Sequence, residues 1–193
     1  MNSYKGTSQL SPIPVFILCV LVGCTQDNPG DAPVGDTGVS GGWSGTAEQF
    51  AEQFVQHGGH LNTMTHYTGT LTILDDEARK VSQESYKDGL RQGISTRWHN
   101  NGNKQMEATY VDGKRSGPTY QWYIDGKKKS EKEYSSGTAH GKEAAWYDDG
   151  SLHYERHFAG GRPDGVWTDW DRGGNVVRQV EYRDGKALRQ IVP

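Results

Sequence analysis

Residues 86–181 read YKDGLRQGISTRWHNNGNKQMEAT (86–109), YVDGKRSGPTYQWYIDGKKKSEKE (110–133), YSSGTAHGKEAAWYDDGSLHYERH (134–157) and FAGGRPDGVWTDWDRGGNVVRQVE (158–181). The four segments align without a gap at a step of 24 residues, and a fifth copy begins at Tyr182. A weaker copy, HYTGTLTILDDEARKVSQES, precedes them at 66–85. Self-similarity at a fixed period of this length is typical of repeat proteins. We therefore expect one structural unit per copy.

Each unit contains two turn signals that separate two short strands. One is a Gly-x-x-x-Gly stretch, such as Gly113 to Gly117, which mostly follows Asp, and the other is Asn-Gly or Asp-Gly, as at Asn101-Gly102. Asn and Asp before Gly favour positive φ and mark β-hairpins. Loops this short connect only antiparallel neighbours. The sequence therefore predicts an all-β repeat protein: a single-layer antiparallel meander of nine or ten strands, built from 24-residue β-hairpin repeats.

Alternation along the strands predicts two unlike faces. The expected aromatic face carries one row of rings that forms a thin core. This row contains Tyr86, Trp98, Tyr110, Trp122, Tyr134, Trp146, Phe158, Trp170 and Tyr182. The opposite parity of the second strand holds Glu107, Glu131 and Glu155. We interpret these three carboxylates as part of a charged face in water and as a candidate interaction face.

These units resemble MORN repeats in the variant form found in many bacterial proteins. The second unit carries the resemblance with Gly113-Lys114-Arg115-Ser116-Gly117, Trp122-Tyr123, Asp125-Gly126 and Lys127-Lys128, and the third has the same arrangement. The resemblance covers residues 86–193 and departs in the fourth unit, where Asp171-Arg172-Gly173-Gly174 replaces the usual aromatic residue and Asp-Gly. It implies a twisted single-layer sheet with roles in scaffolding, self-association or lipid binding.

The first 24 residues contain an export signal. Lys5 is followed by an apolar stretch from Ile13 to Val22, which is too short to span a bilayer as a helix. Leu21-Val22-Gly23-Cys24 resembles a bacterial lipobox, which implies that residues 1–23 are a signal peptide and that Cys24 is lipidated. The alternatives are an ordinary secretory signal and an uncleaved apolar tail. The implied location is the cell envelope, with Thr25 favouring the outer membrane or periplasmic face.

Two segments separate the expected anchor from the repeats. Residues 24–46 are rich in Gly, Asp, Pro, Thr and Ser, a composition that predicts a disordered linker. Residues 47–66 begin with an apolar stripe at helical spacing, and Thr46 with Gln49 matches a capping box. We expect a short helical cap there and repeats over 67–193.

Composition and motifs favour binding over catalysis. Residues 86–193 hold eighteen basic and fifteen acidic residues, which is far from the basic surface of a nucleic-acid binder. No catalytic constellation, metal site or cofactor motif is recognisable in the sequence. We expect a non-enzymatic module that binds an envelope protein or polymer, attached to the membrane through its lipid. The alternatives are a carbohydrate or cell-wall binder that uses the aromatic rows, and an antitoxin-like partner binder.

Overall fold

The computed structural model describes residues 40–50 and 66–192. The described residues form thirteen strands of one sheet. The strands are β1 (Ser40–Thr46), β2 (Thr68–Leu74), β3 (Lys80–Lys87), β4 (Leu90–Trp98), β5 (Lys104–Val111), β6 (Lys114–Trp122), β7 (Lys128–Ser135), β8 (Thr138–Trp146), β9 (Leu152–Ala159), β10 (Arg162–Pro163), β11 (Gly165–Trp170), β12 (Val176–Arg183) and β13 (Lys186–Val192).

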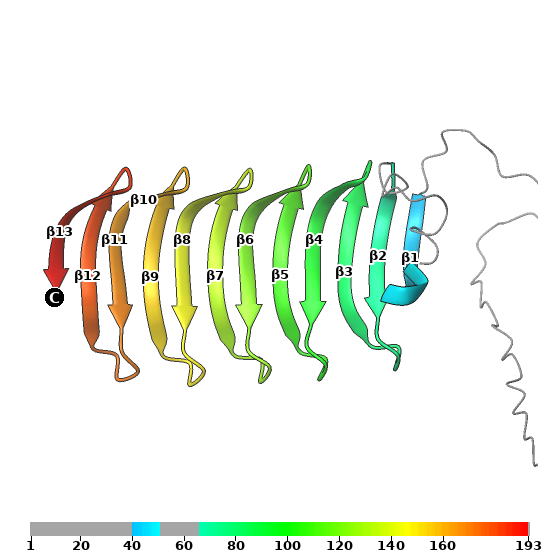
Figure 1. Ribbon diagram of the computed structural model, residues 1–193, viewed down its shortest axis with the longest axis horizontal. Coiled ribbons are helices and arrows are strands. Elements are labelled where there is room, and N and C mark those ends of the chain that lie inside the picture. The colour runs from blue at the N-terminus through cyan, green and yellow to red at the C-terminus, as the bar shows by residue number, and fades with distance from the viewer. Residues whose placement is uncertain (1–39, 51–65, 193) are drawn as a thin grey trace, which may run out of the picture. The chain divides into compact units, whose positions relative to one another are not determined.

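The strands follow one another across the sheet in chain order, as Figure 1 shows. From β2 onward every pairing is antiparallel, with the short β10 pairing with β9. This meander confirms the predicted fold class. The prediction of nine or ten strands was too low, because the weak copy at 66–85 contributes β2 and part of β3, and β1 adds another.

β1 corrects the expected linker boundary. Residues 40–46 pair in parallel with β2, with Trp43 opposite Leu71, so the assignment of these residues to a disordered linker was wrong. A parallel pairing requires a long connection, and the chain between the two strands supplies one. Residues 47–50 then form a helical turn. Its capping box is present, since the Thr46 amide donates to Gln49 Oε1 (2.9 Å) and the Gln49 amide donates to Thr46 Oγ1 (3.2 Å).

At one end of the strands, two-residue turns join the units. In the turn from β5 to β6, Asp112 and Gly113 both have positive φ, 48° and 75°. Two positive φ angles define a type I′ turn, which matches the twist of a hairpin. The Gly113 amide also donates to the carbonyl of Arg91, two strands earlier, at 2.9 Å. The same bond recurs from Gly89, Gly137, Gly161 and Gly185.

At the other end, three-residue turns close each hairpin. The His99 amide donates to the carbonyl of Asn103, the Gly102 amide donates to the carbonyl of His99, and Gly102 has a φ of 86°. A turn of this kind, with glycine in the left-handed region, is a common hairpin connection. Each turn is followed by a β-bulge. Trp98 pairs with Lys104 but Arg97 pairs with Met106, so Gln105 is the extra residue.

This bulge changes which residues share a face. An extra residue in one strand moves the side chains beyond it to the opposite face of the sheet. Thr96, which has the same parity as Trp98, therefore pairs with Glu107 rather than with Ala108. The bulge recurs beside Trp122, Trp146 and Trp170. The prediction of one aromatic and one charged face was wrong, because each face carries its own aromatic row.

The core consists of a few alanine, tyrosine and aliphatic side chains of the sheet. Ala108 and Ala144 are almost completely buried, and Tyr67, Tyr110 and Val180 are also buried. Among the described residues, no large side chain is more than 98% buried. Stability therefore depends on contacts along the rows of the sheet.

The conformation of Gly117, inside β6, provides a test of the strand's backbone geometry. Its φ is 95°, and a Cβ there would lie 3.8 Å from Thr109 Cβ, so strain rather than crowding opposes a side chain. We expect Gly117→Ala to lower the free energy of unfolding by about 1–2 kcal/mol. Urea unfolding followed by tryptophan fluorescence measures this loss. Ser116→Ala, at a residue without positive φ, is the control, and equal losses in both variants would contradict the assignment.

Candidate functional site

We name the first face of the sheet the tyrosine face. It carries the ring that begins each unit, namely Tyr86, Tyr110, Tyr134, Phe158 and Tyr182, together with the residues that pair in register with them. A hollow of about 240 Å³ lies on this face in the second and third units. Its lining includes Arg115, Thr119, Lys132, Tyr134, Glu143 and Tyr154.

Polar groups converge on this hollow. Lys132 Nζ lies 2.8 Å from Glu143 Oε2, and the Tyr154 hydroxyl donates to Glu143 Oε1 at 3.0 Å. Burial and the neighbouring Glu143 carboxylate raise the pKa of Tyr154 to about 12. The phenol therefore stays protonated at neutral pH and acts as a hydrogen-bond donor. An uncharged phenol, a carboxylate and a lysine side by side form a polar binding surface.

The opposite face, which we name the tryptophan face, carries Trp98, Trp122, Trp146 and Trp170. Three of these rings are covered by a lysine from the preceding unit. Lys80, Lys104 and Lys128 lie 5.7, 5.8 and 5.0 Å from the ring centroids of Trp98, Trp122 and Trp146. Such cation–π contacts are worth about 0.5–1 kcal/mol each at exposed sites.

The three glutamates predicted as an interaction face also lie on the tryptophan face. Glu107 pairs with Lys104 at 2.6 Å and Glu131 pairs with Lys128 at 2.9 Å. Glu155 pairs with Lys142 at 2.8 Å, and Lys142 also lies 3.8 Å from Glu131. Each carboxylate therefore already has a lysine partner within the chain. A ligand would have to compete with these lysines for the glutamates.

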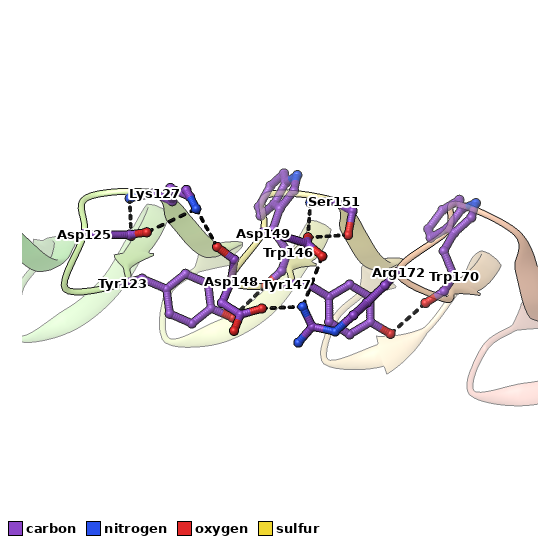
Figure 2. A network of polar contacts seen from close by, with 10 residues as sticks. All are labelled: Tyr123, Asp125, Lys127, Trp146, Tyr147, Asp148, Asp149, Ser151, Trp170 and Arg172. Atoms are coloured by element: carbon purple, nitrogen blue, oxygen red, sulfur yellow. Dashed lines mark hydrogen bonds and ion pairs between the residues drawn. The ribbon is translucent and has the colours of Figure 1, made fainter.

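A ladder of hydrogen bonds joins the units beside the three-residue turns (Figure 2). The Tyr123 hydroxyl donates to the carbonyl of Trp146 at 2.8 Å, and the Tyr147 hydroxyl donates to the carbonyl of Trp170 at 2.9 Å. His99 Nε2 lies 3.0 Å from the carbonyl of Trp122 at the equivalent position. The residue after Trp98, Trp122 and Trp146 therefore connects its unit to the next.

The fourth unit uses a different connection, because Asp171 stands where the other units have a ring. Arg172 instead reaches back to the third unit, where it pairs with Asp148 and lies 3.1 Å from Asp149 Oδ2. Its guanidinium also lies 4.7 Å from the Tyr147 ring centroid (Figure 2). Hydrogen bonds from the Ser151 hydroxyl and amide, together with Arg172, lower the pKa of Asp149 to about 2.

The structure places the residues predicted from the sequence on two different faces of the sheet. The nine aromatic residues form two rows on opposite faces, and the three glutamates share a face with the tryptophans. Cys24 lies outside the described residues. Within 40–50 and 66–192, no group of three or more His, Cys, Asp or Glu residues is placed to hold a metal ion. The lysine row was missed, although its 24-residue spacing from Lys80 to Lys128 is visible in the sequence.

Comparison with known proteins identifies the repeat. Residues 91–112 match the family model described as MORN repeat variant. The matched segment contains the hairpin of β4 and β5, apart from Leu90, and ends at Asp112, the first residue of the two-residue turn that follows. This match confirms the resemblance predicted from the sequence. The later units share the 24-residue period of the matched segment.

Other comparisons add little to this result. No curated protein matches the chain. The solved structure "Crystal Structure of TarM" is 12% identical, with a TM-score of 0.32 over 51% of this chain and 20% of that one. The chain thus spans about a fifth of that structure, and the similarity is too low to support an argument about function. In the part of the chain that the structure describes, no helix has the length and apolar character needed to cross a bilayer.

The low pKa of Asp149 predicts a pH dependence of stability. A carboxyl whose pKa is lowered by folding stabilises the protein fully above about pH 4, its unfolded value, and loses this effect as the pH falls towards 2. We expect Asp149→Asn to reduce the fall in melting temperature between pH 5 and pH 2. The control is Asp76→Asn, at an exposed turn residue, which should leave the fall unchanged. A profile identical for all three proteins would show that Asp149 does not contribute.

Proposed function

We propose that this chain is a non-enzymatic MORN-type interaction module, held at the bacterial cell envelope by a lipid on Cys24, that binds a protein partner through the tryptophan face. The MORN repeat match supports the role of a repeat module for interaction. The proposal for the anchor is supported by the apolar stretch and Leu21-Val22-Gly23-Cys24. The outer membrane or periplasmic face is the proposed location.

The observation that carries the binding proposal is an apolar patch formed by Leu90, Ile94 and Val111. These side chains are 50%, 55% and 44% exposed and come from the adjacent strands β4 and β5. Ile94 pairs with Thr109, next to the pair of Gly93 and Tyr110, which places Ile94 on the tryptophan face. Neighbouring exposed apolar side chains are typical of protein interaction sites.

The register places the other two members of the patch on the same face. Leu90 pairs with Lys87, and it comes one residue before Arg91, which pairs with Tyr86 on the tyrosine face. Leu90 therefore points to the opposite side. Val111 pairs with Lys114 beside the pair of Tyr110 and Arg115 and is placed in the same way. The three aliphatic side chains thus form one surface beside the two-residue turns.

The structure disfavours the carbohydrate-binding alternative on the tryptophan face. A sugar stacks on the flat face of an aromatic ring, but lysines already lie over Trp98, Trp122 and Trp146. A sugar would have to displace them. Lys104 and Lys128 are also held by Glu107 and Glu131, which makes their displacement more costly.

The anchor is tested by replacing the proposed lipid acceptor. Cys24→Ser should abolish incorporation of a labelled fatty acid and release the protein from the membrane fraction, because a serine hydroxyl does not accept the lipid. Cys19→Ser is the matched control and should retain both properties. Membrane retention of the Cys24→Ser protein, or loss of label from both variants, would contradict a lipid on Cys24.

The partner surface is tested by photo-crosslinking in cells. A photoreactive phenylalanine replaces Ile94 in the patch or Ile124 in a three-residue turn, residues with nearly equal exposure of 55% and 53%. We expect a discrete protein adduct from position 94 only. Leu90→Ser in the same chain should reduce its yield several-fold. Equal adducts from both positions, or none from position 94, would contradict binding through the patch.

A further inference from the structure

The repeat lets one unit be compared with the next at equivalent positions. Each cluster on the tyrosine face combines the end of one copy with the start of the next, and we assign it to the unit that starts there. In the cluster of the first unit, Glu84, which belongs to the weak copy, is buried on the tyrosine face, with 7% exposure. Its carboxylate accepts hydrogen bonds from the Tyr86 hydroxyl (2.6 Å), Arg91 Nε (3.1 Å) and the Ser95 hydroxyl (3.5 Å). The first unit thus contains a complete carboxylate site that is occupied by a residue of the chain.

The second unit has similar hydrogen-bond donors but lacks the carboxylate. Twenty-four residues further along, Tyr110, Arg115 and Thr119 replace Tyr86, Arg91 and Ser95, while Ala108 replaces Glu84. None of the ion pairs among the described residues includes Arg115. Its guanidinium donates to the phenol oxygens of Tyr110 and Tyr134, each at 3.4 Å, and lies 5.4 Å from the Tyr134 ring centroid.

The Thr119 hydroxyl is a second, independent sign of an unfilled site. Thr119 is only 6% exposed, and its Oγ1 is buried without a hydrogen-bond partner. An unsatisfied buried hydroxyl is destabilising and requires an explanation. Thr119 and Arg115 both line the 240 Å³ hollow on the tyrosine face. The unsatisfied hydroxyl and the unpaired cation therefore border the same space.

The later units contain their own carboxylates. In the third unit, Lys132 pairs with Glu143 at 2.8 Å, and in the fourth, Arg156 pairs with Asp169 at 3.2 Å. Among the charged residues that line the hollow, Lys132 pairs with Glu143, and Glu131 pairs with Lys128. Arg115 is the lining residue whose charge has no ion-pair partner, which leaves a positive group for an anion in the second unit.

We propose that the second unit binds a carboxylate supplied from outside the chain, an aspartate or glutamate side chain of a peptide segment, with Arg115 and Thr119 as its donors. This inference goes beyond the proposed function, because the hollow lies on the tyrosine face, opposite the patch of Leu90, Ile94 and Val111, and is a second binding surface. The carboxylate takes the role that Glu84 has in the first unit. A guanidinium and a hydroxyl suit this ligand, since hydrogen bonds between charged groups are about twice as strong as neutral ones.

The test uses the full chain and calorimetric titration with a capped hexaglutamate peptide. Hexaglutamate should bind, and a capped hexaglutamine peptide should not. An oligogalacturonate of similar charge is the third probe. Equal binding of the two peptides would overturn the proposal, as would preferential binding of oligogalacturonate, which would assign the site to an acidic sugar.

Substitutions locate the bound carboxylate. Arg115→Gln should weaken hexaglutamate binding about tenfold or more, and Thr119→Val should weaken it by about fivefold, because both remove a donor. Lys114→Gln makes the same change of charge on the opposite face and should leave the affinity within about twofold. Equal losses from Arg115→Gln and Lys114→Gln would show only general charge attraction and would overturn the proposal.

Exchanging the residues at the equivalent positions 84 and 108 gives a further test, in which the Glu84→Ala variant is expected to gain a binding site. Glu84→Ala should empty the first unit and raise the stoichiometry from one peptide to two. Ala108→Glu should fill the second unit and abolish binding, with circular dichroism used to verify folding. An unchanged stoichiometry in folded Glu84→Ala protein would overturn the proposal. If position 94 gives the crosslinked adduct in cells but the protein does not bind hexaglutamate in the titration, this inference is overturned and the proposed function is unaffected.

Discussion

The hydrogen bond from each two-residue turn to the preceding unit is the constraint on which the rest of the sheet depends. The amides of Gly89, Gly113, Gly137, Gly161 and Gly185 donate to carbonyls 22 residues earlier, at 2.7–2.9 Å. Each bond requires positive φ at the turn, which Gly adopts without strain and Asp adopts at modest cost. Because the bond repeats at each turn, units cannot shift relative to one another, and equivalent side chains form rows.

Rows of equivalent side chains on the two faces of the sheet take the place of a hydrophobic core between layers. A single layer has no second sheet or helix to bury its faces, so its stabilisation is shared among many modest contacts. Lysines over tryptophans on one face, arginines over tyrosines on the other, and the tyrosine-to-carbonyl ladder beside the turns all repeat with the unit. In such an array each unit contacts mainly its neighbours. A substitution is therefore expected to weaken one junction between units.

The hairpins were predictable from sequence. Which residues of the two strands of a hairpin share a face of the sheet was not. Dipeptides such as Asp112-Gly113 and Asn101-Gly102 indicate turns directly, and alternation correctly grouped residues within each strand. A single bulged residue such as Gln105 then reversed the second strand relative to the first. A bulge residue has no distinctive side chain, since the equivalent positions are Lys129, His153 and Val177. The bulge is determined by how the backbones of two strands pair. The alternation of residues along a single strand gives no information about this pairing.

The candidate site was hidden from sequence analysis for a related reason. Glu84 and Ala108 occupy equivalent positions, and this difference gains meaning only because the register places Ser95 and Thr119 beside them. Because the backbone has the same conformation in each unit, a side chain can be compared directly with its equivalent in the next unit. Where a unit loses one member of a cluster and keeps the others, the remaining donors are left as a binding surface. The proposed carboxylate site is therefore a departure from the repeat, the loss of the acidic residue at position 108.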